Sequence, residues 1–519
     1  MQDFEVREKE LLRQEIQVSL DNERTALERN IAGQFATPPE LARDIMRAAI
    51  ARHATDSINF LEPACGSGSF ISSLYLESQN KTVVSVEGYE IDQRFSDTAQ
   101  RLWKGLGAII HHDDFLQATP SKLASLVVAN PPYSRHHHLD ADRKRRYKHK
   151  AKAASGIDIN GLSGLYVYFI LSTHAWLAPG AVSAWLIPSE FLDVNFGVAL
   201  KEYLLENVAL THIHRFEPEH VHFSDATVTS SVVIFENRNR RPNDKVKFST
   251  GGLLHNPVKE HHIQIGELDP EEKWSPIFHG RRRQETKDVP RLGRYFTIRR
   301  GIATGNNKFF IRAREELKQL GIRKEHVTPI LPSSRYVQQS VVDADDQGFP
   351  LGVPQLGLIN TSLNPAQLSM ADPSLKKVLE AADEKVRGGY IVRNRTPWYK
   401  QERREVAPFL LTYMGRSSNS RDKSLRFILN KSQAIATNGY LMLYPKGDLE
   451  VALKNNAVTL EDIHEVLNSI SNQDMSDGGR VYGGGLQKME PKELASLEVV
   501  ALSELLSEKG KATVTETIL

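Results

Sequence analysis

The sequence predicts an α/β protein with an open, mostly parallel sheet, followed by a second domain of mixed α+β structure. Short runs of β-forming residues alternate with helical stretches over residues 31–240, a pattern typical of parallel sheets. The first of these runs leads directly into a glycine-rich turn. After residue 290, Pro, Gly and Arg become frequent and the apolar runs become short and irregular, which indicates a different kind of domain.

Length and composition limit the classes of protein. The chain has 519 residues, and at about 100–200 residues per domain this predicts two to four domains. The single cysteine, Cys65, excludes a disulfide scaffold and a cysteine-rich zinc site, and it fits a reducing compartment. The most apolar stretch, residues 165–177, is too short for a membrane span. The N-terminus is charged and shows no signal peptide, so we expect a cytoplasmic protein without a membrane partner.

The chain divides into four segments. Residues 1–30 hold eight acids and five bases and are interpreted as an N-terminal helical arm. Residues 31–240 form the expected α/β domain, and the polar, turn-rich residues 241–289 form a connecting region with little core of its own. Residues 290–519 form the second domain. The apolar residues near helical spacing in the arm are Leu11, Leu12, Ile16, Val18 and Leu20.

Each expected strand is a short apolar run rich in β-branched residues. In the α/β domain the expected strands are 57–61, 82–90, 108–111, 126–129, 181–187 and 231–235, with helices at 39–52 and 164–177 between them. In the second domain the expected strands are 308–311, 409–414 and 439–444. Ligands of open α/β sheets bind at the carboxyl ends of the strands, so the segments that follow the strands are the candidates for a site.

The glycine-rich turn after the first strand has the sequence EPACGSGSF. Gly66 and Gly68 allow backbone angles that other residues resist and a close approach to a ligand. The helix that follows favours a carboxylate or phosphate at its N-terminus. A dinucleotide site would want a third glycine where the chain has Ile71. The turn therefore predicts a ligand site of another kind, with an ordinary structural turn as the alternative.

Acidic residues follow the second and third strands. Glu90 ends the second strand, where an acid commonly binds ribose hydroxyls. Asp114 and Phe115 follow the third strand, where an acid and an aromatic ring can hold an adenine ring. Solvated loop acids are the alternative for each residue alone. Their spacing after the glycine turn favours a shared nucleoside site.

The tetrapeptide Asn130-Pro131-Pro132-Tyr133 follows the apolar run LVVA and is the most informative segment. Two prolines fix the backbone and remove two N–H donors, which leaves carbonyl oxygens as acceptors beside the Asn130 side chain. Tyr133 offers a flat ring. These groups suit an exocyclic amino group on a planar ring: Asn130 and Pro131 accept its two hydrogens while Tyr133 stacks on the ring. An ordinary proline turn is the alternative.

With these motifs in order, the chain resembles the gamma-class, Taq-type DNA adenine-N6 methyltransferases. The resemblance covers most of the chain, starting with QFATPPE at residues 34–40 and continuing through the glycine turn to the NPPY tetrapeptide. The segments RGIATGNNKFF from residue 300, TNGY from residue 437 and GGGLQK from residue 483 resemble the target-recognition domain. The family implies a Rossmann-like methyltransferase sheet, S-adenosylmethionine as cofactor, double-stranded DNA as partner and a restriction-modification setting.

The resemblance assigns roles to residues that occupy the family's motif positions. The cofactor contacts that it implies are Thr37, Glu62, Ala64, Gly66, Gly68, Glu90, Asp114 and Phe115. The catalytic residues that it implies are Asn130, Pro131, Pro132, Tyr133 and, stacking on the other face of the base, Phe223. Cys65 lies inside the glycine motif and is interpreted as a small packing residue.

The net charge is only +2, which by itself argues against a nucleic-acid binder, but the local charge differs. Residues 143–152 contain seven Lys or Arg and no acid; residues 281–300 contain eight bases and two acids; residues 385–431 contain twelve bases and three acids among aromatic residues. Such segments suit phosphate and base contacts. The expected DNA contacts are Arg143, Lys144, Arg145, Arg146, Lys148, Arg300, Lys308 and Trp398.

Several alternatives stay open at this point. His136, His137 and His138 suggest a metal site, but no second ligand cluster has metal spacing, so we expect no metal and a polar loop near DNA phosphate. A protein-glutamine methyltransferase also uses NPPY but is short. A cytosine-N4 enzyme shares the turn, and a non-catalytic DNA-binding protein with a decayed cofactor site is a further alternative. A fused nuclease is not expected, because only about 30 residues precede the first motif, and a separate cognate restriction endonuclease stays open as a second partner.

Overall fold

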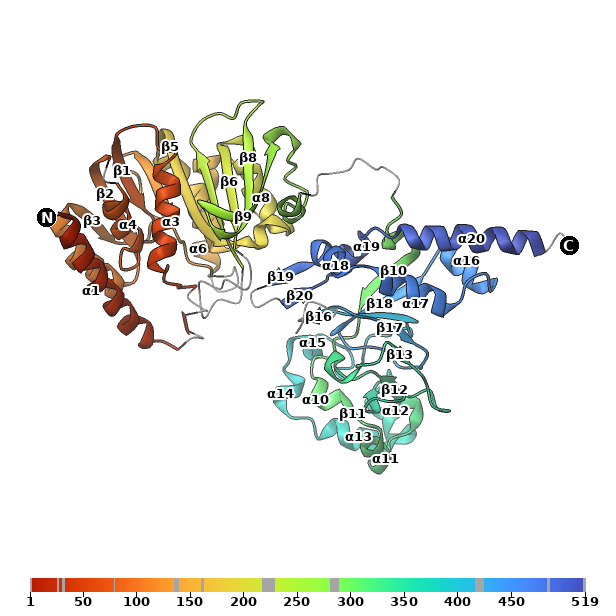
Figure 1. Ribbon diagram of the computed structural model, residues 1–519. Helices are drawn as coiled ribbons and strands as arrows, with labels where there is room; N and C mark the ends of the chain where they lie inside the picture. The colour runs from red at the N-terminus through yellow and green to blue at the C-terminus, as the bar shows by residue number, and fades with distance from the viewer. Residues whose placement is uncertain are drawn as a thin grey trace. The chain divides into compact units, whose positions relative to one another are not determined.

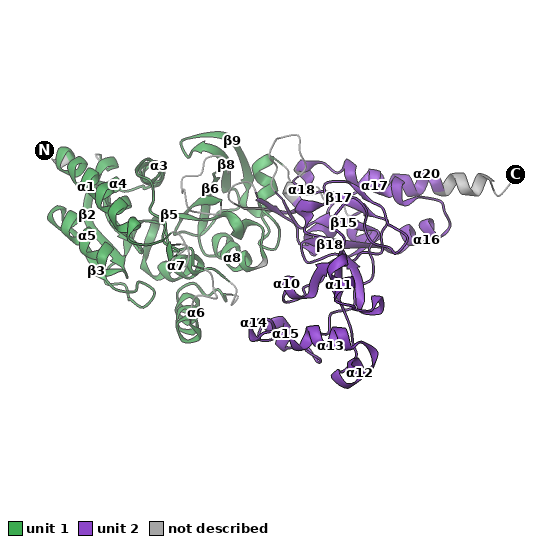
Figure 2. Ribbon diagram, turned by 90° about the horizontal axis from the view of Figure 1, so that it is seen from below, with its two compact units in different colours: residues 1–283, 482–484 green, residues 284–481, 485–519 purple. Residues whose placement is uncertain are grey.

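The computed structural model describes residues 2–25, 28–29, 33–78, 80–134, 140–159, 163–216, 229–280, 289–415, 424–482 and 486–516. Two compact units make up the chain, and each is described by itself. The first unit comprises residues 1–283 and 482–484, and the second comprises residues 284–481 and 485–519 (Figure 2).

A nine-stranded sheet organises the first unit (Figure 1). Its strand order is β3-β2-β1-β4-β5-β7-β6-β8-β9. The first five strands in this order are parallel, and β7 is antiparallel to both of its neighbours. The strands are β1 Ser57–Glu62, β2 Thr82–Glu90, β3 Ala108–His112, β4 Ala124–Ala129, β5 Leu177–Pro188, β6 Ala209–Arg215, β7 Ser230–Glu236, β8 Lys245–Leu253 and β9 Asn256–Gln264. The predicted α/β class is confirmed, and all six strands expected before residue 240 are present.

Helices cover both faces of this sheet. Along a strand, successive side chains point to opposite faces, and the buried residues accordingly fall into two groups. Phe60 and Leu126 belong to the core beneath α3, α4 and α5, whereas Leu61 and Val127 belong to the core beneath α7 and α8. The helices of this unit are α1 Gln2–Asn22, α3 Pro39–Ile50, α4 Ser69–Glu77, α5 Gln93–Trp103, α6 Ala141–Ser155, α7 Leu165–Thr173 and α8 Val198–Glu206.

The strand order reverses between β1 and β4, and this point positions the site. The two strands are parallel neighbours, with Phe60 opposite Leu126 and Leu61 opposite Val127. Their carboxyl ends therefore deliver the glycine turn and the NPPY tetrapeptide to the same edge of the sheet. Such reversal points are where open α/β sheets bind ligands.

The expectation of a connecting region at residues 241–289 needs correction, because β8 and β9 extend the main sheet there. Phe248 of β8 is fully buried and meets Trp274 and Phe278 edge-on, at ring-centroid distances of 6.1 and 5.2 Å. These residues join the core of the first unit. The polar sequence hides this because β9 is an edge strand with mostly exposed side chains.

The N-terminal arm is helical as predicted, but a different face of α1 packs against the domain. Leu11 and Val18 are 63% and 61% exposed. The residues turned towards α4 and α5 are Val6, Glu10, Arg13 and Gln17. The arm therefore attaches mainly through polar side chains, which the spacing of its apolar residues did not indicate.

The second unit combines short sheets with short helices, as predicted. Its sheets have the orders β10-β18-β15-β17-β13, β11-β14-β12 and β16-β20-β19. The strands are β10 Phe296–Arg300, β11 Ile311–Ala313, β12 Val327–Ile330, β13 Val341–Val342, β14 Leu356–Ile359, β15 Phe409–Thr412, β16 Met414–Gly415, β17 Phe427–Asn430, β18 Tyr440–Pro445, β19 Arg480–Tyr482 and β20 Leu486–Lys488. The helices are α9 Leu292–Tyr295, α10 Asn307–Phe310, α11 Arg314–Gln319, α12 Pro365–Ala371, α13 Pro373–Glu380, α14 Glu384–Arg387, α15 Tyr390–Arg393, α16 Asp448–Lys454, α17 Leu460–Ser469, α18 Asn472–Gly478, α19 Pro491–Ala495 and α20 Val500–Glu516.

One expected strand of this unit is wrong. Residues 308–310 lie in the helical turn α10, and only Ile311 begins a strand. The Asn306 side chain accepts a hydrogen bond from the Phe309 N–H at 3.0 Å and so caps the helical turn. The other two expected strands are present as β15 with β16, and as β18. No helix in the described parts of either unit is long and apolar enough to cross a bilayer.

Asp44 generates a first prediction. Its buried carboxylate accepts the Leu254 N–H at 2.7 Å and His255 Nδ1 at 2.5 Å, and so ties α3 to the β8–β9 hairpin. We expect Asp44→Ala to lower the free energy of unfolding of the first unit by about 1–3 kcal/mol, because a buried N–H loses its acceptor. Chemical denaturation measures the change. Val258→Ala, at a 72% exposed position of β9, is the control with a smaller effect; equal stabilities of Asp44→Ala and the unmodified protein contradict the prediction.

Candidate active site

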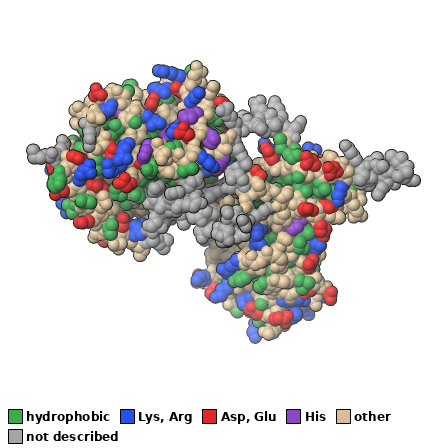
Figure 3. Space-filling view, viewed as in Figure 1, with side chains coloured by type: hydrophobic (Ala, Val, Ile, Leu, Met, Phe, Trp, Pro, Cys, Tyr) green, Lys and Arg blue, Asp and Glu red, His purple; other side chains and the backbone are tan. Residues whose placement is uncertain are grey.

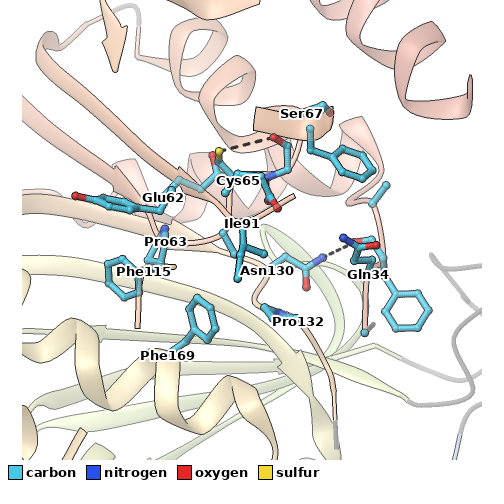
Figure 4. Close-up of a pocket in the computed structure, with 18 of the residues that line it drawn as sticks. Gln34, Glu62, Pro63, Cys65, Ser67, Ile91, Phe115, Asn130, Pro132 and Phe169 are labelled. Carbon is cyan, nitrogen blue, oxygen red and sulfur yellow. Dashed lines mark hydrogen bonds between the residues drawn. The ribbon is translucent and has the colours of Figure 1, made fainter. Parts of the chain in front are cut away.

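A cavity of about 290 Å³ opens at the carboxyl ends of β1, β2 and β4. Its wall includes most of the residues assigned from the sequence (Figure 4). Those residues are Thr37, Glu62, Ala64, Gly66, Glu90, Asp114, Phe115, Asn130 and Pro132. The expected nucleoside-site residues and the NPPY asparagine thus meet in one cavity within the first unit.

The glycine turn uses its two glycines differently. Gly66 has a φ of 53°, and a Cβ atom there would meet nothing within 4 Å, so its backbone faces open space. Gly68 has a φ of 91°, and a Cβ there would lie 2.3 Å from Trp103 Nε1. Gly66 lines the cavity and Gly68 does not. Gly68 is therefore required for packing, whereas Gly66 leaves room for a ligand beside the backbone.

Glu62 is the most unusual charged group of the cavity. Its side chain is 2% exposed, and Oε2 has no hydrogen-bond partner among the described residues. Burial raises the pKa of its carboxyl well above the usual range, although the N–H groups of Ile71 and Phe70 partly oppose this. Such a buried carboxyl stays protonated unless a cationic partner stabilises its ionised form. The positive charges of S-adenosylmethionine would supply such a partner.

Glu90 and Asp114 each make structural contacts as well as lining the cavity. Glu90 accepts the N–H groups of Gly66 at 2.9 Å and Asp92 at 2.8 Å, and burial raises its pKa. It therefore holds the glycine turn in place. Asp114 accepts the Leu116 N–H at 3.0 Å and the Tyr147 hydroxyl at 2.7 Å. Both acids therefore already accept hydrogen bonds from groups within the protein, and a nucleoside in the cavity would add to these bonds or replace them.

Phe115 contributes less open surface than expected. It is 2% exposed and lies in an aromatic cluster, with ring-centroid distances of 5.0 Å to Trp176, 5.5 Å to Tyr89 and 5.8 Å to Phe169. Phe115 lines the cavity but is otherwise packed in the core. Cys65 is also buried, and burial raises the pKa of its thiol well above the usual range. The thiol is protonated and packs, in line with the sequence interpretation.

The Asn130 amide is fixed in orientation. Its Nδ2 donates to the Phe35 carbonyl at 2.9 Å and to Thr37 Oγ1 at 3.0 Å. Both amide hydrogens are thereby used, which leaves Oδ1 as the remaining hydrogen-bonding atom of the Asn130 side chain, an acceptor. Thr37, expected to contact the cofactor, is in this structure also the residue that orients Asn130.

Tyr133 is anchored beside the cavity rather than in its wall. Its hydroxyl donates to the Leu186 carbonyl at 3.1 Å, and its ring lies 5.7 Å from that of Phe35. Its backbone N–H donates to the Gly33 carbonyl at 3.1 Å. Pro131 is buried and does not line the cavity. Phe223 and the three histidines at 136–138 lie outside the described residues.

Two helices border the cavity in a way that the sequence did not predict. From α1, Arg13, Gln17 and Asp21 line it, and from α6, Arg143 and Tyr147 do. Arg13 forms an ordinary i,i+3 pair with Glu10, a pattern common on solvated helices, so nothing in the sequence distinguished it. Tyr147 lies inside the basic run at residues 143–152. Only its burial marks it as a cavity residue, and burial cannot be deduced from the sequence there.

The expected DNA contacts are distributed over both units. Arg143 borders the cavity, while Lys144, Arg145, Arg146 and Lys148 lie exposed or half-buried on α6. In the second unit, Arg300 lies 4.1 Å from the centre of the Tyr413 ring, and Lys308 is exposed. Trp398 packs against Phe309 and Phe310 and is only partly exposed. On the face shown in Figure 3, basic side chains are interspersed with acidic ones.

Comparisons with known proteins agree with this geometry. A family model described as Eco57I restriction-modification methylase matches residues 71–222, and one described as the C-terminal domain of Type II methyltransferase M.Eco57I matches residues 280–518. Type II methyltransferase M.AccI of Acinetobacter calcoaceticus is 26% identical over 483 residues, which are 89% of this chain and 84% of that protein. Type II methyltransferase M.XamI of Xanthomonas campestris pv. amaranthicola is 27% identical over 492 residues, which are 91% and 86% of the two chains.

Among solved structures, the Type IIL restriction-modification enzyme MmeI, in complex with DNA, has a similar fold. The TM-score is 0.51 at 12% identity, and the match covers 88% of this chain and 63% of that chain. The family matches and relatives support a DNA methyltransferase of the restriction-modification type whose cofactor is S-adenosylmethionine.

Glu62 generates a prediction about pH. Its raised pKa means that the free protein keeps this carboxyl protonated at pH values above the usual 4.5. A bound cation favours the ionised form, so cofactor binding releases a proton. Affinity should therefore rise with pH through the raised pKa, by at most about tenfold per pH unit for one proton.

Calorimetry in buffers of different ionisation enthalpy measures both the affinity and the released proton. Glu62→Gln should bind the cofactor more weakly and lose the pH dependence. Glu40→Gln, at an 82% exposed side chain on α3, is the control and should behave like the unmodified protein. An affinity that does not change with pH in the unmodified protein contradicts the prediction.

Proposed function

We propose that the chain transfers a methyl group from S-adenosylmethionine to the N6 amino group of an adenine that has left the DNA duplex, as the modification enzyme of a restriction-modification system. The observation that carries this proposal is the fixed orientation of the Asn130 amide. Its Nδ2 donates to groups within the protein, and its Oδ1 is left as a hydrogen-bond acceptor on a residue that lines the cavity. It supports a substrate amino group as the methyl acceptor. A separate cognate endonuclease is part of the proposal.

The chemistry requires help from acceptors because the amino lone pair of adenine is delocalised into the ring. Hydrogen bonds from its two amino hydrogens to Asn130 Oδ1 and the Pro131 carbonyl localise that pair on nitrogen. Bound S-adenosylmethionine supplies an electrophilic methyl group on a positively charged sulfur. The nitrogen–carbon bond forms, the carbon–sulfur bond breaks, and one amino proton is lost to solvent. Orientation of the two reactants supplies much of the acceleration.

The adenine has to leave the duplex because its amino group is otherwise paired and stacked. Tyr133 stands next to Pro132 with its hydroxyl anchored, and we assign it to stacking on the extruded base, with Phe223 on the other side. Stacking of this kind contributes about 1–3 kcal/mol per base. The basic residues of α6 and of the second unit are assigned to the DNA backbone.

The relatives support the substrate class. M.AccI and M.XamI are named Type II methyltransferases, and the MmeI structure is of a complex with DNA. To identify the modified base, DNA is first methylated by this protein with labelled S-adenosylmethionine. The DNA is then digested, and its nucleosides are separated. N6-methyl-2′-deoxyadenosine is the expected product. N4-methyl-2′-deoxycytidine would instead support the cytosine enzyme, and unlabelled DNA would contradict a DNA methyltransferase.

Asn130→Ala should reduce methylation by about 100- to 1,000-fold, since it removes a group aimed at the reacting atoms. Cofactor affinity and DNA affinity should stay unchanged, because both depend on other residues. A methyl-transfer assay with a DNA-binding measurement in parallel checks this. Asn239→Ala, at an exposed position after β7, is the control; retained turnover in Asn130→Ala sinks the assigned role.

Tyr133→Ala should weaken base extrusion, because the extruded ring loses one stacking surface worth about 1–3 kcal/mol. DNA with 2-aminopurine at the target adenine reports extrusion by a rise in fluorescence. Tyr133→Phe keeps the ring and loses only the bond to the Leu186 carbonyl, so it should retain the fluorescence rise. Equal fluorescence in the Ala and Phe variants argues against stacking by Tyr133.

A further inference from the structure

Helix α1 reaches across to the glycine turn of the catalytic domain. Arg13 on this helix is 2% exposed, and its Nη1 donates to Ser67 Oγ at 3.1 Å. Ser67 Oγ in turn donates to Gln17 Oε1 at 2.7 Å. Arg13 and Gln17 both line the cavity. The arm is therefore part of the wall around the cofactor, at the turn that approaches it most closely.

The segment that follows α1 also contacts the catalytic domain. Just past the last helical residue, Asn22, Arg24 pairs with Asp92 at 2.9 Å, and Glu23 pairs with Arg94 at 2.7 Å. Asp92 is the second residue after the end of β2, with Ile91 between them. The helix is thus attached to the catalytic domain both at the glycine turn and after β2.

Arg13 has donors to spare. Glu10 accepts from Nε at 2.7 Å and from Nη2 at 2.6 Å, and Ser67 accepts from Nη1. These contacts use three of the five N–H groups of a guanidinium. A buried ion pair contributes little to stability compared with apolar packing, so anchoring alone does not account for a buried arginine at a cavity. Its fork geometry instead suits a carboxylate ligand.

Glu62 supplies the complementary charge. The methionine end of S-adenosylmethionine carries a carboxylate and an ammonium group a single carbon apart. Arg13 provides donors for the first, and the unpartnered Oε2 of Glu62 provides an acceptor for the second. The two residues are close enough for the charge of Arg13 to lower the pKa of Glu62 against the effect of burial.

We propose that Arg13 binds the carboxylate at the methionine end of S-adenosylmethionine, so that the N-terminal helix completes the cofactor site. This inference rests on the proposed function and adds a residue outside the motifs from which that function was argued. It makes α1 a binding element rather than an appendage.

The test compares two ligands that differ only at the end that Arg13 contacts. S-Adenosylhomocysteine carries the amino-acid group, and 5′-methylthioadenosine has a methyl group in its place. Titration calorimetry on the full chain without DNA gives both affinities. Arg13→Gln should weaken S-adenosylhomocysteine by about 10- to 100-fold, the effect of one charge-assisted contact, and should leave 5′-methylthioadenosine unchanged. Arg7→Gln, at an exposed residue of the same helix, should change neither.

Arg13→Gln leaves Glu10 buried without its partner, so the double variant Glu10→Gln/Arg13→Gln is measured beside it. The same selective loss is expected in the double variant, because both charges are then absent. An equal loss of both ligands, or no loss of S-adenosylhomocysteine, overturns the proposal. If the unmodified protein binds neither ligand, the proposed function itself is contradicted. This outcome is seen without any variant, so it is distinguishable from a failure of the Arg13 proposal.

Discussion

The parallel pairing of β1 with β4 is the interaction on which the site depends. It places the carboxyl ends of two strands side by side, and the chain leaves them towards opposite faces of the sheet. Glu62 and the glycine turn leave one strand, and Asn130 leaves the other. The remaining contacts hold these two segments still: Glu90 accepts the Gly66 N–H, and the backbone at residue 35 together with Thr37 accepts the Asn130 amide.

Buried charge is the second organising feature of this cavity. Glu62 is buried with one unpartnered oxygen, and Arg13 and Glu10 are buried as a pair. Taking such groups out of water in their charged form costs free energy that contacts within the protein do not fully recover. A cationic ligand beside Glu62 offsets part of this cost. Binding to the folded state alone also stabilises it by mass action, so the same electrostatics that recognise the ligand strengthen the domain that holds it.

The sequence predicted the α/β sheet well because strands at its centre read as clear apolar runs, such as LVVA before Asn130. It did not predict the interior strands β6 and β8, or β9 at the edge of the sheet. β9 is polar and mostly exposed, and its place is revealed only by its partner β8 and by Trp274. Motif residues with local signals, such as Gly66 and Asn130, were found. Arg13 and Tyr147 were missed, because their role depends on burial against distant segments, and an i,i+3 ion pair or a tyrosine in a basic run carries no local sign of it.

Helix α6 has two faces with different neighbours. Tyr147 is 4% exposed and bonds to Asp114 beside the cavity, whereas Arg145 and Arg146 are exposed. A DNA phosphate bound by the exposed arginines and a ligand bound in the cavity would therefore both contact helix α6. By thermodynamic linkage, whatever factor the cofactor contributes to the affinity for DNA, DNA contributes the same factor to the affinity for the cofactor. The order of addition then alters only how fast the ternary complex assembles, and its stability is the same by either route.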